Sequence, residues 1–89
     1  MELPLAVVSG SVRDIVHKEL EVVGVFNLFK TILTASDPYK PKPSPDIFLA
    51  AAKSLNVSPE YCLVFEDGDS GLEAATKAGM QIVDVRGYI

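Results

Sequence analysis

Four short apolar runs alternate with three segments of helical periodicity, and this order constrains the fold more than any other feature of the 89-residue sequence. The apolar runs are predicted to be strands and cover residues 5–8, 31–35, 62–65 and 81–85. The segments with helical spacing cover residues 11–23, 44–55 and 70–78. Strands that alternate with helices form parallel sheets, and nearly continuous apolar strands are typical of sheets covered by helices on both faces. We therefore expect one three-layer α/β domain with a parallel sheet of about four strands.

Local signals indicate where the predicted helices begin and end. Ser11 is expected to cap the first helix, and Gly24 follows its last turn. Ser44 is expected at the N-cap of the second helix, with Pro45 at the first helical position. Gly79 ends the third helix. The first helix carries apolar residues at helical spacing: Val12, Ile15, Val16, Leu20 and Val23.

Charge and cysteine content narrow the class of protein. The formal net charge is −4, so the sequence lacks the basic surface that nucleic acid requires. A single cysteine, Cys62, leaves no internal disulfide to form and suits a reducing compartment. The apolar run near the N-terminus is too short to cross a bilayer or to act as a signal peptide. We expect a cytoplasmic protein that binds neither nucleic acid nor membrane.

Polar side chains follow three of the four predicted strands. Ser9 ends the first strand, Lys42 lies in the proline-rich loop after the second, and Glu66 and Asp67 end the third. Ligands of open parallel sheets bind outside the carboxyl ends of the strands. We therefore expect a hydroxyl, an ammonium and two carboxylates to converge on one edge of the sheet.

These groups suit phosphate and a divalent cation. Adjacent carboxylates are hard oxygen ligands for Mg²⁺, which uses one or two of them together with water and substrate oxygens. Ser9 precedes a helix N-terminus, where backbone N–H groups bind phosphate oxygens, and the Lys42 ammonium neutralises phosphate charge. Each feature alone is more often structural, since adjacent acids at a strand end are usually a solvated turn or a helix cap. The combination in this order is far more specific than any single member.

Three stretches resemble the second, third and fourth motifs of the haloacid dehalogenase superfamily: "LAVVSGS", "KPKPSPDIF" and "CLVFEDGDSGLEAATKAGM". The most similar branch contains the β-phosphoglucomutase-like enzymes and sugar phosphatases. The resemblance covers essentially the whole chain and implies that residues 1–89 form part of a hydrolase core domain. It also implies a Rossmann-like architecture and a small phosphorylated sugar as substrate.

The resemblance assigns chemical roles by position. Ser9 corresponds to the hydroxyl that binds the transferring phosphoryl group, and Lys42 corresponds to the lysine that stabilises its charge. Glu66 and Asp67 correspond to the acids that hold the Mg²⁺ ion.

The segment after the first strand is expected to complete phosphate binding. Gly10 lies between Ser9 and Ser11, and Ser11 and Arg13 fall where mutase relatives contact the second phosphate of the substrate. Val12 replaces a polar residue that some of those mutases carry, which argues against mutase activity.

The family's nucleophile is the first aspartate of a D-x-D-G-T/V motif on the central strand, and the 89 residues hold neither that motif nor the helical cap that follows it. Asp67-Gly68-Asp69 is a poor substitute for the D-x-D motif, because Glu66 lies between it and the apolar strand. The residues that follow it also match the fourth motif. We therefore expect the chain alone to be inactive and to bind Mg²⁺ weakly or not at all.

The resemblance also implies that, in the family's core, the central strand lies between the first and third strands found here. We expect either that the two halves of the sheet pair directly, or that a second chain supplies strand contacts, by self-association or from a partner. An alternative function is therefore a non-enzymatic interaction module completed by another chain. A signalling receiver domain also gathers acids, a hydroxyl and a lysine, but it places its acid pair on the first strand, contrary to the order here.

Overall fold

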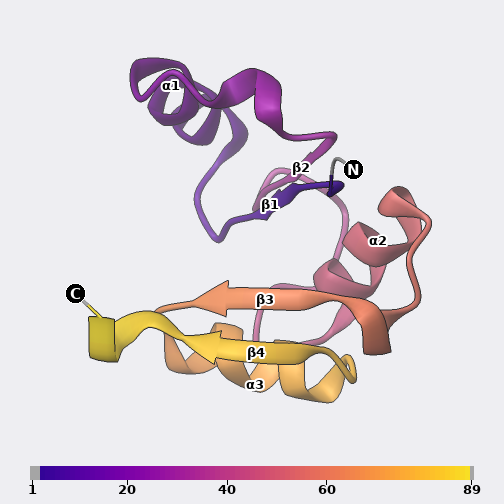
Figure 1. Ribbon diagram of the computed structural model, residues 1–89. Coiled ribbons are helices and arrows are strands. Elements are labelled where there is room, and N and C mark those ends of the chain that lie inside the picture. Colours follow the sequence, from indigo (N-terminus) through magenta and orange to yellow (C-terminus); the bar gives the residue numbers. More distant parts are fainter. Residues whose placement is uncertain (1–2, 89) are drawn as a thin grey trace.

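The computed structural model describes residues 3–88 and shows a small α/β protein with parallel strands, which confirms the predicted fold class (Figure 1). Short 3₁₀ turns lie at Phe26–Leu28, Pro59–Tyr61 and Val85–Tyr88. The strands and helices follow in the order β1 (Ala6–Val8), α1 (Arg13–Val22), β2 (Thr31–Leu33), α2 (Asp46–Leu55), β3 (Leu63–Glu66), α3 (Asp69–Lys77) and β4 (Gln81–Asp84).

The strands form two separate two-stranded parallel sheets rather than one continuous sheet. In the first, β1 pairs with β2 and Val7 lies opposite Ile32. In the second, β3 pairs with β4 and Val64 lies opposite Ile82. Within residues 3–88, β1 and β3 do not pair with each other, so direct pairing of the two halves is not what the structure adopts.

Helix α2 joins the two sheets into one folded unit. It packs against β1 and β2 and also contacts α3, which packs on β3 and β4. The buried core lies along this line of contacts and is built mainly from apolar residues of α2 and α3: Ile47, Phe48, Ala52, Ala74, Ala75, Ala78 and Met80. Burial of these side chains is the main favourable contribution to holding the halves together.

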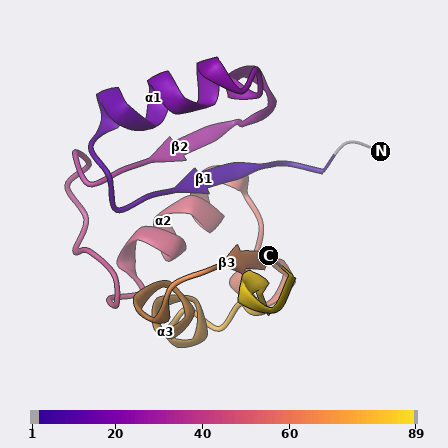
Figure 2. The same cartoon turned by 90° about the vertical axis from the view of Figure 1, so that its left-hand side faces the viewer.

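The two sheets differ in how helices cover them. Helices α1 and α2 lie on opposite faces of β1–β2 (Figure 2). On β3–β4, α3 covers one face, whereas Leu63 and Phe65 are 53% and 67% exposed. Coverage of both faces by helices, expected from the apolar strands, therefore holds for one sheet only within the described residues.

The predicted helix ends are right for the glycines and wrong for Ser11. Gly24 and Gly79 have φ angles of +78° and +79°, a conformation that favours glycine after a helix. Helix α1 begins at Arg13 with Val12 as its N-cap residue, and the Ser36 hydroxyl rather than Ser11 accepts a hydrogen bond from the Arg13 N–H at 3.0 Å. The Ser11 carbonyl instead accepts a hydrogen bond from the Ala35 N–H at 2.9 Å, which ties the segment before α1 to the end of β2.

The start of α2 is displaced by one residue from its predicted position. The helix begins at Asp46, and Pro45 is the N-cap residue. The Ser44 hydroxyl still accepts a hydrogen bond from the Asp46 N–H at 3.3 Å. Ser44 therefore bonds to the first helical N–H group without being the N-cap.

Much of the apolar stripe on α1 faces solvent. Val16 is buried, whereas Ile15 and Val23 are 52% and 67% exposed. Of the helices in residues 3–88, none has the length and apolar character needed to cross a membrane.

Candidate phosphate and metal site at the strand ends

Lys42 links the carboxyl ends of β1 and β3. It lies in the loop between β2 and α2, and its Nζ atom is 3.0 Å from Glu66 Oε2, at the end of β3. The same ammonium donates a hydrogen bond to the Val8 carbonyl, at the end of β1, over 3.3 Å. The predicted convergence of Lys42 and Glu66 at one edge is therefore present in the structure.

The Lys42–Glu66 ion pair is largely withdrawn from solvent. The two side chains are 15% and 12% exposed, and Lys42 Nζ lies 5.3 Å from the centre of the Phe48 ring. An aromatic face at that distance attracts a cation. Each charge of such a pair depends on the other, because removal of one leaves the second charge poorly solvated.

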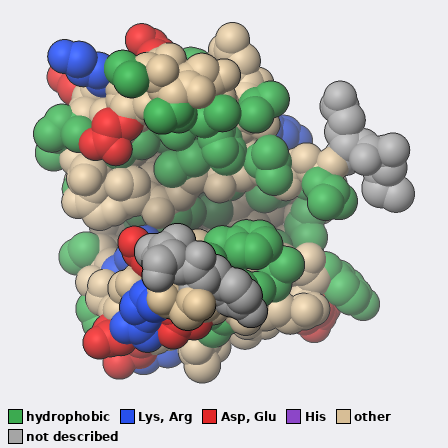
Figure 3. Space-filling model, turned by 60° about the vertical axis from the view of Figure 1, so that its left-hand side comes forward, with side chains coloured by type: hydrophobic (Ala, Val, Ile, Leu, Met, Phe, Trp, Pro, Cys, Tyr) green, Lys and Arg blue, Asp and Glu red, His purple; other side chains and the backbone are tan. Residues whose placement is uncertain are grey.

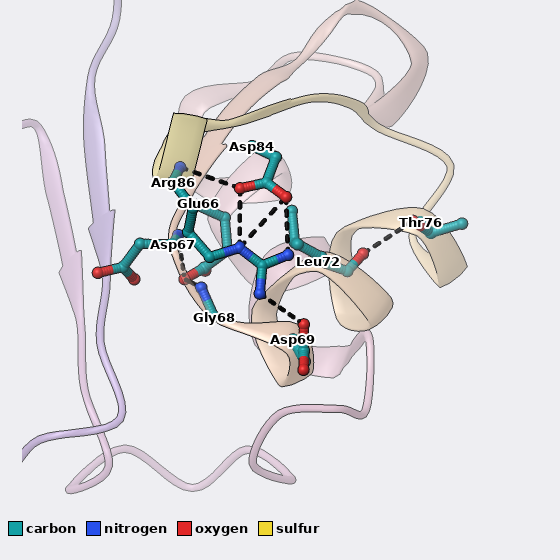
Figure 4. A network of polar contacts seen from close by, with 8 residues as sticks. All are labelled: Glu66, Asp67, Gly68, Asp69, Leu72, Thr76, Asp84 and Arg86. Carbon is teal, nitrogen blue, oxygen red and sulfur yellow. Dashed lines mark hydrogen bonds and ion pairs between the residues drawn. The ribbon is translucent and has the colours of Figure 1, made fainter. Parts of the chain in front are cut away.

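Glu66 also holds the turn that leads into α3. Its Oε1 atom accepts hydrogen bonds from the N–H groups of Asp67 at 3.1 Å and Gly68 at 3.2 Å, just before α3 begins at Asp69 (Figure 4). A carboxylate at a helix N-terminus is favoured by the helix dipole. Glu66 therefore has a structural role that does not require a metal.

The segment that follows β1 lies beside Lys42. Ser9 comes directly after Val8, and its N–H donates to the Leu33 carbonyl at 2.9 Å, which extends the pairing of β1 with β2. The Ser9 hydroxyl accepts a hydrogen bond from the Ser11 N–H at 3.1 Å. Gly10 and Ser11 are exposed at this turn. This places the predicted phosphate-binding segment at the β1 end that Lys42 contacts.

Arg13 forms an ion pair with Asp37, a residue that sequence reasoning missed. The Arg13 side chain is 38% exposed and the Asp37 side chain 16%. Asp37 also accepts a hydrogen bond from the Thr34 N–H at 2.7 Å. The spacing Thr34-x-x-Asp37 is that of a capping box, in which an acid reaches back to an N–H three residues earlier, and this signal could have identified Asp37.

The environment of Asp37 favours its charged form. Burial raises the pKa of the carboxyl group, but the hydrogen bond from the Thr34 N–H and the nearby Arg13 charge outweigh burial. The pKa of Asp37 therefore lies below its ordinary value. Asp37 is well suited to hold the Arg13 guanidinium in place at the start of α1.

Asp67 completes the predicted acid pair, and its side chain is exposed. In Figure 4 its carboxylate points away from the cluster formed by Asp84, Arg86 and Asp69. Within residues 3–88 no three acid, histidine or cysteine side chains gather as a metal centre. Two carboxylates fit the oxygen chemistry of Mg²⁺ but supply only part of a coordination shell.

A second polar cluster, also missed in the sequence, joins β4 to the start of α3. Arg86 forms ion pairs of 2.7 Å with both Asp84 and Asp69 (Figure 4). Hydrogen bonds from Arg86 lower the pKa of Asp84 to about 2. Asp69 therefore takes part in an exposed ion pair.

Sequence comparison identifies relatives over nearly the whole chain. The family described as haloacid dehalogenase-like hydrolase matches residues 1–85. The chain is 42% identical over 83 residues to fructose-1-phosphate phosphatase from Escherichia coli strain K12, an overlap of 93% of this chain and 44% of that protein. The chain thus spans less than half the length of this relative.

Solved structures show the same fold. A HAD family hydrolase from Deinococcus radiodurans R1, determined with bound phosphate and sodium, has a TM-score of 0.82 at 35% identity and matches 90% of this chain and 36% of its own. β-Phosphoglucomutase from Clostridium difficile has a TM-score of 0.70 at 37% identity and matches 75% of this chain and 30% of its own.

Proposed function

Because the chain belongs to the haloacid dehalogenase-like hydrolase family, we propose that it forms part of the core domain of a Mg²⁺-dependent phosphatase for small phosphorylated sugars. The family resemblance seen in the sequence is confirmed by the match to residues 1–85. Relatives named as a fructose-1-phosphate phosphatase and a β-phosphoglucomutase support the substrate class. Hydrolysis is preferred over mutase activity because Val12 stands where some mutases have a polar residue.

The observation that carries this proposal is the position of Lys42 between the ends of β1 and β3. Its ammonium contacts the Val8 carbonyl and the Glu66 carboxylate, so it lies beside both the Ser9 segment and the acid pair. Ser9, Gly10 and Ser11 would bind phosphoryl oxygens through hydroxyl and backbone N–H groups. Lys42 would neutralise the charge that develops on those oxygens during phosphoryl transfer.

Arg13 and the acid pair would complete the site. Arg13, held by Asp37 at the start of α1, would contact a second anionic group of the substrate. Glu66 and Asp67 would hold Mg²⁺ with further oxygen ligands from outside the 89 residues. The bound ion would supply positive charge to the phosphate oxygens.

We expect the 89-residue chain by itself to bind phosphate and Mg²⁺ only weakly and to turn over no phosphate ester, since none of its residues matches the family's nucleophile. Phosphate binding is measured by titrating inorganic phosphate into the ¹⁵N-labelled chain with and without Mg²⁺. Shifts at the Ser9, Gly10 and Ser11 amides are expected, and Lys42→Ala should weaken them several-fold. The exposed Lys77→Ala is the matched control and should leave them unchanged.

Two results would count against this proposal. Phosphate shifts that are equal in the wild type and Lys42→Ala would remove Lys42 from the site. Hydrolysis of 4-nitrophenyl phosphate by the purified chain, abolished by Lys42→Ala, would overturn the claim that the chain is inactive alone.

A further inference from the structure

The segment that follows β1 is tied to the segment that follows β2 beyond the ends of both strands. The Ser9 N–H donates a hydrogen bond to the Leu33 carbonyl at 2.9 Å. Two residues further along each segment, the Ala35 N–H donates to the Ser11 carbonyl, also at 2.9 Å. The predicted phosphate-binding residues are therefore held at successive points by the chain that leaves β2.

Arg13 is held by the same segment through both its backbone and its side chain. Its N–H donates to the Ser36 hydroxyl at 3.0 Å, and its guanidinium forms an ion pair with Asp37. Helix α1 begins at Arg13, and the N-cap residue Val12 has no side-chain oxygen to offer. The Ser36 hydroxyl thus bonds to one of the N–H groups that have no partner inside the helix.

The Thr34 side chain fixes the turn that carries Ser36 and Asp37. Thr34 is only 1% exposed, and its hydroxyl accepts a hydrogen bond from the Ser36 N–H at 3.2 Å. The same hydroxyl donates to Asp37 Oδ2 at 3.3 Å, and the Thr34 N–H donates to that oxygen at 2.7 Å. Asp37 Oδ1 is the atom that pairs with Arg13. Thr34 therefore holds both groups that hold Arg13.

The series of contacts reaches the Ser9 hydroxyl through Ser11. The Ser11 N–H donates to Ser9 Oγ at 3.1 Å, while the Ser11 carbonyl is bonded to Ala35. Since the Ser9 oxygen accepts this hydrogen bond, its own hydrogen can be donated to another group. A hydroxyl oriented as a donor suits a phosphoryl oxygen, which is the role proposed for Ser9.

The other side of β1 borders a hollow between the two halves of the molecule (Figure 3). The cleft there has a volume of about 590 Å³ and is lined by residues of β1 and β3, which do not pair with each other within residues 3–88. The hydrogen bonds described above for residues 9–13 come from the β2 side or from within the segment itself. The geometry of this segment therefore depends on the turn after β2.

We infer that Thr34 is a positioning residue for phosphate binding. Its hydroxyl holds Ser36 and Asp37, and through them it keeps residues 9–13 in the arrangement that presents the Ser9 hydroxyl and the Arg13 guanidinium to the substrate. Thr34 is too deeply buried to touch a ligand, so it acts only through these neighbours. Such supporting contacts matter because binding groups must be held close to their productive positions. The inference rests on the proposed function, since it assumes that residues 9–13 bind phosphate.

Thr34→Val tests this role, because valine has nearly the shape of threonine but makes neither hydroxyl bond. Inorganic phosphate is titrated into the ¹⁵N-labelled chain, and the dissociation constant is read from the Ser9 and Ser11 amides. We expect that constant to rise at least fivefold, and the Arg13 N–H to exchange at least fivefold faster without phosphate, as the hydrogen bonds of the turn are lost. Thr34→Ser keeps a hydroxyl and should restore both quantities to within twofold of wild type.

Thr31→Val is the matched control. Thr31 is also buried on the chain of β2, but it is the first residue of the strand, and its hydroxyl bonds to Ser54 rather than to the turn after β2. Its replacement should change phosphate binding and Arg13 exchange less than twofold. Should Thr34→Val not fold, Ser36→Ala at an exposed position removes the oxygen that Arg13 bonds to and should raise both quantities at least threefold. Ser54→Ala is the control for that variant.

Several results would overturn the inference. These are equal phosphate binding by wild type and Thr34→Val, equal losses for Thr34→Val and Thr31→Val, or a loss that Thr34→Ser does not restore. Weaker binding with unchanged exchange at Arg13 would place the effect outside this series of hydrogen bonds and would also overturn it. Absence of phosphate shifts in the wild type is a different failure, because it would overturn the proposed function itself and the positioning role with it.

Discussion

The carboxylate of Glu66 occupies the space that a side chain at position 71 would need. Gly71 is buried in the first turn of α3, and a Cβ built there would overlap the Glu66 carboxyl group. The glycine thus allows Glu66 to lie across the start of α3, where it accepts hydrogen bonds from the turn before the helix and pairs with Lys42. The requirement at position 71 is space rather than an unusual backbone angle.

Gly71→Ala is therefore expected to be destabilising. The methyl group must push Glu66 out of its place, so its hydrogen bonds to the turn before α3 and its ion pair with Lys42 are both weakened. We expect the free energy of unfolding to fall by about 1–3 kcal/mol, the range for overpacking a buried position. Urea denaturation measures the free energy of unfolding. Gly87→Ala is the control, because nothing lies within 4 Å of a Cβ at that exposed position. Equal stability of the two variants would contradict this account.

Lys42→Met should lower the free energy of unfolding by about 2–4 kcal/mol, because it leaves the Glu66 carboxylate poorly solvated and without its cation. Glu66→Gln added to Lys42→Met should recover part of that loss, which a double-mutant cycle quantifies. The control is Lys77→Met, whose ion pair with Glu73 lies on the surface with both side chains about half exposed. That variant is expected to change stability by less than about 0.5 kcal/mol. Similar losses for the two lysines would show that burial of the Lys42 pair has no energetic importance.

Arg86→Met tests the cluster at the start of α3. Hydrogen bonds from Arg86 hold the pKa of Asp84 at about 2, so their removal should raise that pKa toward the ordinary value of about 3.9. The carboxyl carbon shift of Asp84, followed by NMR between pH 1.5 and 6, reports this change directly. Asp46, which lies on α2, serves as the internal reference in the same spectra. An unchanged Asp84 titration would mean that Arg86 does not hold this carboxylate in solution.

Much of the fold follows from local sequence signals. Alternation of strand and helix predicts parallel strands, and parallel strands place their carboxyl ends together, so the meeting of Lys42 with Glu66 could be anticipated. Prolines on both sides of Lys42 restrict its loop and reinforce that expectation. Gly24 and Gly79 mark helix ends because the left-handed backbone conformation there favours glycine.

Other features depend on contacts that a linear pattern does not contain. The order of elements along the chain does not specify which strands are neighbours, so it left open whether the halves would pair or remain apart. Arg13 and Asp37 are 24 residues apart, and their ion pair requires α1 to pack beside the end of β2. Ser11 does not cap α1 because the helix begins two residues later, at Arg13, whose N–H bonds to the hydroxyl of Ser36 from the distant segment after β2.

Asp37→Asn should lower stability in a pH-dependent way. The pKa of Asp37 is lowered in the folded protein, so the unfolded chain binds its proton more readily. The stabilisation from this group is therefore fully present above the unfolded pKa of about 3.9 and is lost as pH falls through the folded pKa. We expect Asp37→Asn to cost about 1–2 kcal/mol at pH 7, because the partly exposed charged contact with Arg13 is removed.

The difference between Asp37→Asn and wild type should shrink as pH falls below about 4, because the wild-type carboxyl group then also becomes neutral. Urea denaturation at pH 7, 4 and 2.5 measures this difference in the free energy of unfolding. Glu21→Gln, at an exposed position on α1, is the matched control and should show little difference at any of these pH values. A loss for Asp37→Asn that is constant from pH 7 to pH 2.5 would show that the Asp37 charge does not hold Arg13. The hydrogen bond from the Thr34 N–H would not explain such a loss of stability either, because asparagine can still accept it through its amide oxygen. The loss would then come from local packing.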